Sequence, residues 1–352
     1  MSASSDQVQA LRQLPGWPRL PLAQLPTPIH PLPNFSREVG REVWIKRDDL
    51  TGLAGGGNKT RKLEFLVGDA VETGADMVAT VGAIQSNHTR QTAAAAARAG
   101  IKCSLLHYGW TKDAGEHYRK VGNILLSSVM GADLYLDDTD RPIEDNGPLD
   151  EFGDYLETQG HRPYLIPGGG SDHRLGSLGY VACAAEIVSQ MSSLGTHFDY
   201  VVHCTGSGGT QAGLIAGFKA LDCICRVIGI PDDYETDIKR ERVLRLSNAT
   251  LTDLDVPIRV QPGDVEIVAS DMSPYGIADQ ETYRAIDFLA RSEGLMADPV
   301  YEGKAVRGLL DLVCNNRFGK DSRILLLHLG GTPAVHAYAN QFEPIELRQS
   351  PV

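Results

Sequence analysis

Strand-like and helix-like segments alternate along most of the chain, and this alternation limits the possible folds more than any other feature. Short apolar runs typical of strands occupy residues 42–46, 77–81, 102–107, 133–136, 164–166, 200–204, 226–230 and 324–328. Helical patterns lie at residues 61–71, 87–98, 117–130, 180–191, 211–220, 280–291 and 302–314. Strands that alternate with helices form parallel sheets covered by helices on both faces. The sequence therefore predicts an α/β fold.

The length of the chain indicates two domains. It has 352 residues, and a domain usually takes roughly 100–200. Apolar residues make up 42% and charged residues 22%, which is typical of a globular protein with a sizeable core. Residues 1–35 contain seven of the 19 prolines and little periodicity, so we expect an extended arm there.

The charge balance excludes several classes of partner. The net charge is −12 and no lysine- or arginine-rich run occurs, so we expect neither nucleic acid nor an anionic membrane as a partner. No stretch approaches the ~20 apolar residues of a transmembrane helix, and no secretion signal is visible. Of the six cysteines, Cys223 and Cys225 lack a second Cys/His pair at zinc spacing. We therefore expect a cytoplasmic protein without a metal site.

A glycine-rich stretch, residues 55–57, is followed at once by Asn58 and Lys59. Only one residue separates the last glycine from the lysine, so the spacing of a nucleotide-binding P-loop fails. A lysine at the junction of a loop and a helix suits covalent chemistry, in which a desolvated amine forms a Schiff base. The plainer interpretation is a glycine turn with a solvated lysine.

Three further loops follow predicted strands or open predicted helices, where ligands bind in sheets of this kind. One loop can expose backbone N–H groups at a helix N-terminus, and it predicts a phosphate site: Thr205, Gly206, Ser207, Gly208, Gly209 and Thr210. Residues 85–88 offer hydrogen-bonding side chains, although a helix cap explains one of them. In the last loop, Tyr301 could be a general acid or base, and Glu302 either pairs with a cation or is a solvated helix start.

A reactive lysine, a phosphate anchor and an asparagine-bearing loop together indicate pyridoxal phosphate. The segments 56–64, 85–87 and 298–301 resemble those of the 1-aminocyclopropane-1-carboxylate (ACC) deaminase / D-cysteine desulfhydrase family, in consistent order from about Leu22 to Ala339. This resemblance implies pyridoxal 5'-phosphate as the cofactor and the tryptophan synthase β fold (fold type II). We expect a large domain of residues 1–62 and 175–352, a small domain of residues 63–174, and the cofactor in the cleft between them. We also expect a homodimer or higher homo-oligomer.

The resemblance also implies roles for individual residues. Lys59 resembles the Schiff-base lysine, Asn87 the residue that hydrogen-bonds the cofactor's ring hydroxyl, and residues 205–210 the phosphate loop. The residues expected to act at the substrate, together with Lys59, are Ser86, Tyr275 and Tyr301. The residues expected to contact the substrate are Ser86, Asn87, His88, Trp110, Gly170, Ser171 and Tyr275.

The two branches of the family differ beside the ring nitrogen of the cofactor. Here the positions are Glu302 and Leu329, as in the deaminases, whereas desulfhydrases typically carry hydroxyl residues. A carboxylate favours a protonated ring nitrogen, which is the stronger electron sink. Trp110 is also deaminase-like, but His88 replaces the usual deaminase glutamine and residues 168–171 resemble the desulfhydrase loop.

Three functions follow, with a small amino acid as the ligand in each. The first is an ACC deaminase that yields 2-oxobutanoate and ammonia. The second is a D-cysteine desulfhydrase or a related β-eliminating lyase, such as a cysteate sulfo-lyase. The third is a non-catalytic ligand sensor on the same fold, against which Lys59, Tyr275 and Tyr301 argue.

Overall fold

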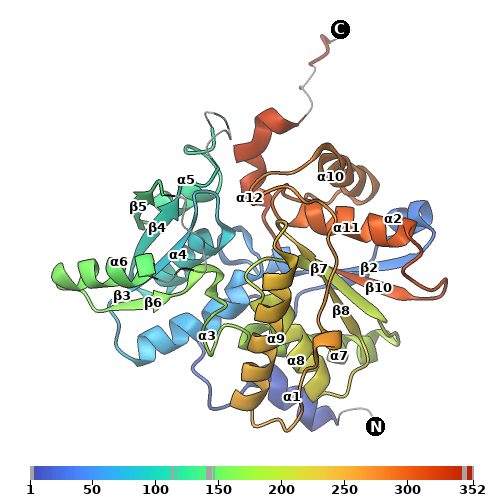
Figure 1. Cartoon of the computed structure of the whole chain (residues 1–352), viewed down its shortest axis with the longest axis horizontal. Coiled ribbons are helices and arrows are strands. Elements are labelled where there is room, and N and C mark those ends of the chain that lie inside the picture. The colour runs from blue at the N-terminus through green and yellow to red at the C-terminus, as the bar shows by residue number, and fades with distance from the viewer. Residues whose placement is uncertain are drawn as a thin grey trace.

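The computed structural model of the chain describes residues 4–111, 115, 117–139, 145, 147–342 and 347–350. Within them the strands form two sheets, and Figure 1 shows the smaller sheet at the left and the larger at the right. The strand order is β1-β2-β10-β7-β8-β9 in the larger sheet and β5-β4-β3-β6 in the smaller one. The predicted α/β fold and all the predicted strands are confirmed.

The larger sheet contains β1 (Ile29–Pro31), β2 (Glu42–Arg47), β7 (Tyr200–Thr205), β8 (Arg226–Pro231), β9 (Glu266–Ile267) and β10 (Arg323–His328). Among these described strands, β1 alone runs antiparallel to its neighbour, and the other pairs are parallel. Successive side chains of a strand point to opposite faces. In β10, Ile324 and Leu326 belong to one buried cluster, and Leu325 and Leu327 to another. The sheet therefore has a core on each face.

Two helix layers cover these two faces. The side with Leu325 packs against α7 (Leu178–Leu194) and α8 (Gly209–Ala220), and α9 (Thr236–Asp253) lies against α8. The side with Ile324 packs against α10 (Gln280–Glu293) and α11 (Glu302–Cys314). Helix α8 starts directly after β7, and α11 starts beside the end of β10, so both helix N-termini lie near the carboxyl ends of parallel strands.

The smaller sheet is parallel throughout and contains β3 (Met77–Ala83), β4 (Lys102–Tyr108), β5 (Asp133–Asp137) and β6 (Pro163–Ile166). Helices α3 (Lys59–Glu72) and α4 (Asn87–Ala99) pack on one face against Val78 and Leu105. Helix α6 (Gly147–Thr158) packs on the other face against Met77 and Ala79. Helix α5 (Asn123–Val129) contacts α4.

The N-terminal segment differs from the predicted extended arm. Helix α1 (Ser5–Gln13) has a capping box at Ser4, and α2 (Pro33–Val39) begins at a proline, which has no N–H to lose there. Between them the chain is fixed on α3, because the buried Glu64 carboxylate accepts hydrogen bonds from the backbone N–H groups of Leu22 and Ala23, both at 2.9 Å. The proline-rich segment is therefore ordered and packs on α3.

Four further helices of the described residues depart from the sequence prediction. The helix expected from His117 begins only at Asn123, because Gly122 has φ +70° and turns precede it. Helices α6, α9 and α12 (Thr332–Val335) were not predicted. Within the described residues, no helix is both long and apolar enough to cross a membrane.

The smaller sheet lies wholly within the expected small domain of residues 63–174, inserted between β2 and β7. The chain enters it through α3 and returns to the larger sheet before α7. The boundaries themselves, at residues 62/63 and 174/175, stay a prediction. The same holds for the homo-oligomeric state.

Candidate active site

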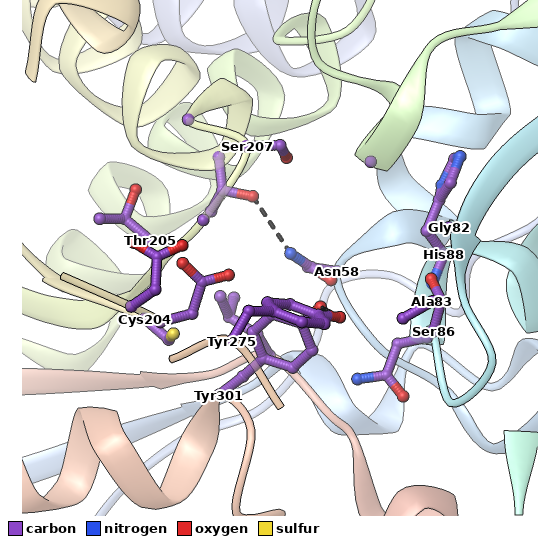
Figure 2. A pocket seen from close by; sticks show the side chains of 18 of the residues that line it. Asn58, Gly82, Ala83, Ser86, His88, Cys204, Thr205, Ser207, Tyr275 and Tyr301 are labelled. Atoms are coloured by element: carbon purple, nitrogen blue, oxygen red, sulfur yellow. Dashed lines mark hydrogen bonds between the residues drawn. The ribbon is translucent and has the colours of Figure 1, made fainter. Parts of the chain in front are cut away.

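A cavity of about 330 Å³ is lined by residues from both sheets, at the carboxyl ends of β3, β7, β8 and β10. Figure 2 shows Ser86 and His88 on the side of the smaller sheet, with Thr205 and Ser207 opposite them. Most predicted site residues line this cavity: Lys59, Ser86, Asn87, His88, Trp110, Thr205, Gly206, Ser207, Gly208, Thr210, Tyr275, Tyr301, Glu302 and Leu329. Loops far apart in the sequence thus meet as predicted for parallel sheets.

Lys59 is the first residue of α3, and the glycines before it allow a tight turn. Gly56 has φ +70°, and a Cβ there would lie 1.8 Å from the backbone oxygen of Asp49, so only glycine fits. The Lys59 Nζ donates to the Gly169 backbone oxygen at 3.2 Å. Burial lowers the pKa of the Lys59 amine to about 8, while the Asp232 carboxylate opposes this shift. A larger fraction of the amine is therefore neutral and nucleophilic near neutral pH.

The loop from Thr205 to Thr210 connects β7 to α8. Within the described part of the chain, the backbone N–H groups of Gly206, Ser207 and Gly208 have no hydrogen-bond acceptor. Free N–H groups next to a helix N-terminus form an anion site. Asn58 borders this loop, and its Nδ2 donates to Thr210 Oγ1 at 3.2 Å, the dashed line in Figure 2.

Gly208 supplies a direct test of this anion site. Its φ is +86°, and a side chain in that region costs about 1–3 kcal/mol. Gly208→Val is therefore expected to weaken cofactor binding by about 5- to 150-fold, measured by fluorescence titration of the stripped protein. Gly195→Val is the matched control, because Gly195 also has a positive φ, +62°, but ends α7 with open space around it. Equal cofactor affinity in the two variants would contradict a phosphate site here.

Ser86 is the N-cap of α4 and Asn87 its first residue, and their side chains make different hydrogen bonds. Ser86 Oγ caps the helix by accepting from the N–H groups of His88 and Thr89, at 3.1 and 3.3 Å, which leaves its own proton for a ligand. Asn87 Oδ1 accepts from Asn123 Nδ2 at 2.9 Å. The Asn87 amide nitrogen has no acceptor within the described ranges. Both residues thus present a donor at the cavity.

Glu302 is a buried carboxyl group that no Lys or Arg of the described residues pairs with. Only 2% of the residue is exposed, and its Oε1 has no hydrogen-bond partner among the residues that the structure describes. His328 Nδ1 lies 3.8 Å from Glu302 Oε2, but it accepts from the Gly330 N–H at 3.2 Å. The His328 Nε2 donates to the Met296 oxygen at 2.9 Å, so the ring directs no N–H at Glu302. Burial and the negative charge of Asp298 raise the pKa of Glu302 well above its usual value.

Aromatic side chains form the wall next to Glu302. The hydroxyl groups of Tyr275 and Tyr301 are 2.5 Å apart, and burial raises the pKa of both phenols well above the usual value. Both therefore keep their protons at neutral pH, so one can donate to the other and the second to a ligand. The ring of Trp110 contacts Tyr275 edge-on, with the centroids 5.5 Å apart.

His88 is held in one tautomer. Thr80 Oγ1 donates to the Ile166 oxygen at 2.6 Å, so it must accept from His88 Nε2, 2.8 Å away. The His88 Nδ1 therefore carries a lone pair, and it is buried without a partner in the described part of the chain. Burial and the charges of Lys59 and Lys62 lower the pKa of His88 well below its usual value. The ring is a neutral acceptor.

Three predicted residues do not line the cavity: Gly170, Ser171 and Gly209. The Gly209 N–H donates to Ser171 Oγ at 3.2 Å, and Ser171 Oγ is also 2.7 Å from both Lys62 Nζ and Ser207 Oγ. Gly170 packs behind His88. These residues lie next to lining residues, Ser171 beside Ser207 and Gly170 beside His88, and their expected contacts with the cofactor or the substrate stay a prediction.

Other residues at the site were not predicted. Asp232 and Lys239 line the cavity and form an ion pair at 3.3 Å. Their position in the sequence could have indicated this role, because Asp232 directly follows β8 and so lies at the same edge of the sheet as Thr205. Lys62 is buried three residues after Lys59 on the same helix face. Burial and the Lys59 charge lower its pKa well below the usual value.

These groups fit pyridoxal 5'-phosphate. The cofactor has an aldehyde, a phosphate, a ring hydroxyl and a ring nitrogen, and the cavity offers a matching group for each. The amine of Lys59 suits the aldehyde, and the free N–H groups of the 205–210 loop suit the phosphate. The Asn87 amide suits the hydroxyl, and the unpartnered Oε1 of Glu302 suits a protonated ring nitrogen. Each match uses an orphaned or perturbed group that the cofactor would satisfy.

Comparison with known proteins also indicates pyridoxal phosphate as the cofactor. Residues 20–330 match the family model described as pyridoxal-phosphate dependent enzyme. A 1-aminocyclopropane-1-carboxylate deaminase from Ralstonia pickettii (strain 12J) is 42% identical over 327 residues, covering 92% of this chain and 97% of the relative. One from Burkholderia ambifaria (strain ATCC BAA-244 / DSM 16087 / CCUG 44356 / LMG 19182 / AMMD) is 43% identical over 328 residues, covering 92% and 97%.

Solved structures agree with this match. A crystal structure described as that of the ACC deaminase homologue superposes with a TM-score of 0.87 at 37% identity, covering 96% of this chain and 98% of the other. A pyridoxal 5'-phosphate-dependent aspartate racemase has a TM-score of 0.63 at 15% identity, covering 94% and 95%. The second likeness shows the fold alone.

Proposed function

Because this chain belongs to the pyridoxal-phosphate-dependent enzyme family, in the group of ACC deaminases and D-cysteine desulfhydrases, we propose that it deaminates ACC to 2-oxobutanoate and ammonia. The observation that carries the proposal is Glu302, a buried carboxyl group whose Oε1 has no partner among the described residues. ACC has no α-hydrogen, so its ring must open with strong electron withdrawal. A carboxylate beside the ring nitrogen favours the protonated ring that supplies it.

The bound cofactor supplies a conjugated ring that withdraws electrons from the substrate's Cα. Four parts of this chain would hold it: Lys59 the aldehyde carbon, the 205–210 loop the phosphate, Asn87 the ring hydroxyl, and Glu302 the ring nitrogen. The apolar side chain of Leu329 beside Glu302 offers no competing hydrogen bond at that edge of the cavity, although the Leu329 backbone does bond to the Glu302 carboxyl group. The pKa of about 8 suits Lys59 to exchange a proton with the substrate near neutral pH.

The remaining cavity residues would act on the substrate itself. The free hydroxyl proton of Ser86 would bind the substrate carboxylate, since the backbone N–H groups of α4 already occupy its oxygen as an acceptor. Tyr301, in contact with the Tyr275 hydroxyl, would donate a proton to the carbon released when the ring opens. Trp110 and the tyrosine rings give the apolar surface that the two methylene groups of ACC require.

One observation favours a second candidate, a β-eliminating lyase such as a D-cysteine desulfhydrase. The His88 Nδ1 is a neutral acceptor without a partner in the described ranges. An acceptor of this kind suits a substrate with a thiol or hydroxyl donor on Cβ, whereas the ring of ACC has none. Glutamine, which the deaminases usually have here, can both donate and accept.

A side-by-side assay of ACC, D-cysteine, L-cysteate and D-serine with the purified holoenzyme tests the proposal. We expect ammonia and 2-oxobutanoate from ACC in equal amounts, with the highest kcat/KM of the four. Sulfide release from D-cysteine without any 2-oxobutanoate from ACC would replace the deaminase with the lyase. Tight binding of one compound without turnover of any would leave only the ligand sensor.

A further inference from the structure

Arg90 is a fully buried arginine without a carboxylate partner among the described residues. It lies on α4, one turn after Asn87, and none of its surface is exposed. No Asp or Glu of the described residues comes within ion-pair distance of it. Arg61 is buried to the same degree, but it pairs with the carboxylates of Asp48 and Glu186 at 2.7 and 3.0 Å.

The partners of Arg90 are neutral oxygens. One Nη2–H donates to the Gly56 backbone oxygen at 2.6 Å, and Nη1 donates to Asn123 Oδ1 at 2.9 Å and to Asn87 Oδ1 at 3.5 Å. Its Nε has no acceptor within the described part of the chain. One guanidinium group thus links the glycine turn before Lys59 to the amide of Asn87.

A buried charge without a counter-ion is costly, and proteins normally pair it. Burial lowers the pKa of Arg90 to about 10, with the Asp298 carboxylate opposing the shift, so the side chain stays charged at neutral pH. Asp298 does not lie within ion-pair distance of Arg90, and its Oδ1 instead accepts from the N–H groups of Val300 and Tyr301, at 2.8 and 2.9 Å. The network therefore has a surplus positive charge directed at Asn87.

Asn87 transmits this charge to the cavity. Its Oδ1 accepts from both Arg90 and Asn123, and hydrogen bonds in such a chain polarise one another. Accepting two bonds, one of them from a cation, makes the opposite end of the amide a stronger donor. That end carries the Nδ2 hydrogens, which have no acceptor among the described residues and belong to a cavity-lining side chain.

We propose that Arg90 is a positioning residue that stabilises the ionised ring hydroxyl of bound pyridoxal 5'-phosphate through Asn87. The anion that compensates the buried guanidinium group is then the ring oxygen of the cofactor. Arg90 does not touch the cofactor, and Asn87 is the group in contact. This inference rests on the cofactor placement in the proposed function, with the ring hydroxyl at Asn87.

A competition between two cofactors tests the proposal. The holoenzyme is equilibrated at one neutral pH with pyridoxal 5'-phosphate and its analogue without the ring hydroxyl, 3-deoxypyridoxal 5'-phosphate. The amounts of the two bound compounds are then measured by chromatography after denaturation. The readout is the ratio of the two affinities, and a general loss of stability cancels in it. We expect wild type to favour the natural cofactor strongly.

In Arg90→Met, which has a neutral side chain of similar reach, this preference should fall at least about tenfold, the scale of one charge-assisted hydrogen bond. Arg90→Lys keeps the charge and should retain more of the preference. The double variant with Asn87→Ala should fall no further than Asn87→Ala alone, because Arg90 acts through that amide.

An Arg90→Met ratio within about twofold of wild type would overturn the proposal and assign Arg90 a structural role. A wild-type ratio near one would overturn it even if Arg90→Met does not fold. Additive losses in the double variant would also overturn it. If neither compound attaches to Lys59 in wild type, the cofactor placement fails instead, and the two failures are therefore distinguishable.

Discussion

Lys59→Ala is expected to abolish turnover and to leave no covalent attachment of the cofactor to the chain. The amine of Lys59 is the group at the cavity suited to hold the aldehyde, and proton transfer by such a group is by itself worth about 10²- to 10⁴-fold in rate. Borohydride treatment of the yellow wild-type enzyme should fix the cofactor on the peptide that contains Lys59, as detected by mass spectrometry. The same treatment of Lys59→Ala should give unmodified peptides.

The matched control is Lys62→Met. Lys62 is buried three residues later on the same helix, and its Nζ donates to Ser171 and to the same Gly169 oxygen that Lys59 contacts. The adduct should persist on Lys59 in this variant. Cofactor attachment to stripped wild-type protein should also accelerate as the pH rises through about 8, because the neutral amine is the nucleophile. An adduct on Lys62, or none in wild type, would contradict the proposed role.

The fold was largely predictable because the alternation of strands and helices is a local pattern. Parallel strands place their carboxyl ends at one edge, so the loops at Lys59, Asn87 and the 205–210 segment could be expected to meet before any coordinates existed. The three consecutive glycines likewise predicted the turn at residues 55–57. In the structure, Gly56 lies so close to the Asp49 oxygen that no residue with a Cβ would fit there.

The elements that the sequence analysis missed were missed for physical reasons. The prolines of residues 15–33 obscured α1 and α2, and the segment between these helices is held on α3 by contacts such as that of Glu64 with Leu22. Helix α9 was missed because charged and hydroxyl residues interrupt its buried stripe, which includes Lys239 and Val243. Ligand contacts were expected for residues 170–171 from the family resemblance; Ser171 Oγ contacts Lys62 of α3 and Ser207 of the cavity wall, and its contact with a ligand stays a prediction.

The hydrogen-bond and ion-pair partners of the buried side chains at the site could not be predicted from the sequence. Arg61 and Arg90 are both buried arginines. The fold gives Arg61 two carboxylate partners, whereas Arg90 has none among the described residues. The tautomers of His88 and His328 depend in the same way on Thr80 and Gly330. Such differences decide which groups remain available to a ligand.

Glu302→Thr should reduce ACC turnover far more than elimination from D-cysteine. Burial and Asp298 raise the pKa of Glu302 in the structure, and a ring-nitrogen cation would lower it again by supplying the opposite charge. Losing such a charge-assisted hydrogen bond costs roughly 1.5–3 kcal/mol, or about a 10- to 150-fold drop in kcat/KM for ACC. Elimination from D-cysteine needs less electron withdrawal, because it starts with loss of an α-proton and ends with a good leaving group.

Two further variants separate charge from shape at this position. Glu302→Gln keeps the size of the side chain without its charge, so it should lose ACC turnover nearly as far as Glu302→Thr. Adding Leu329→Thr to Glu302→Thr should supply a neutral hydrogen bond beside the ring and favour the lyase reaction further, because Leu329 also lines the cavity. The measurement is the ratio of kcat/KM for the two substrates in each variant. Equal losses on both substrates would make Glu302 a structural residue, and the choice of ACC would then lose its main support.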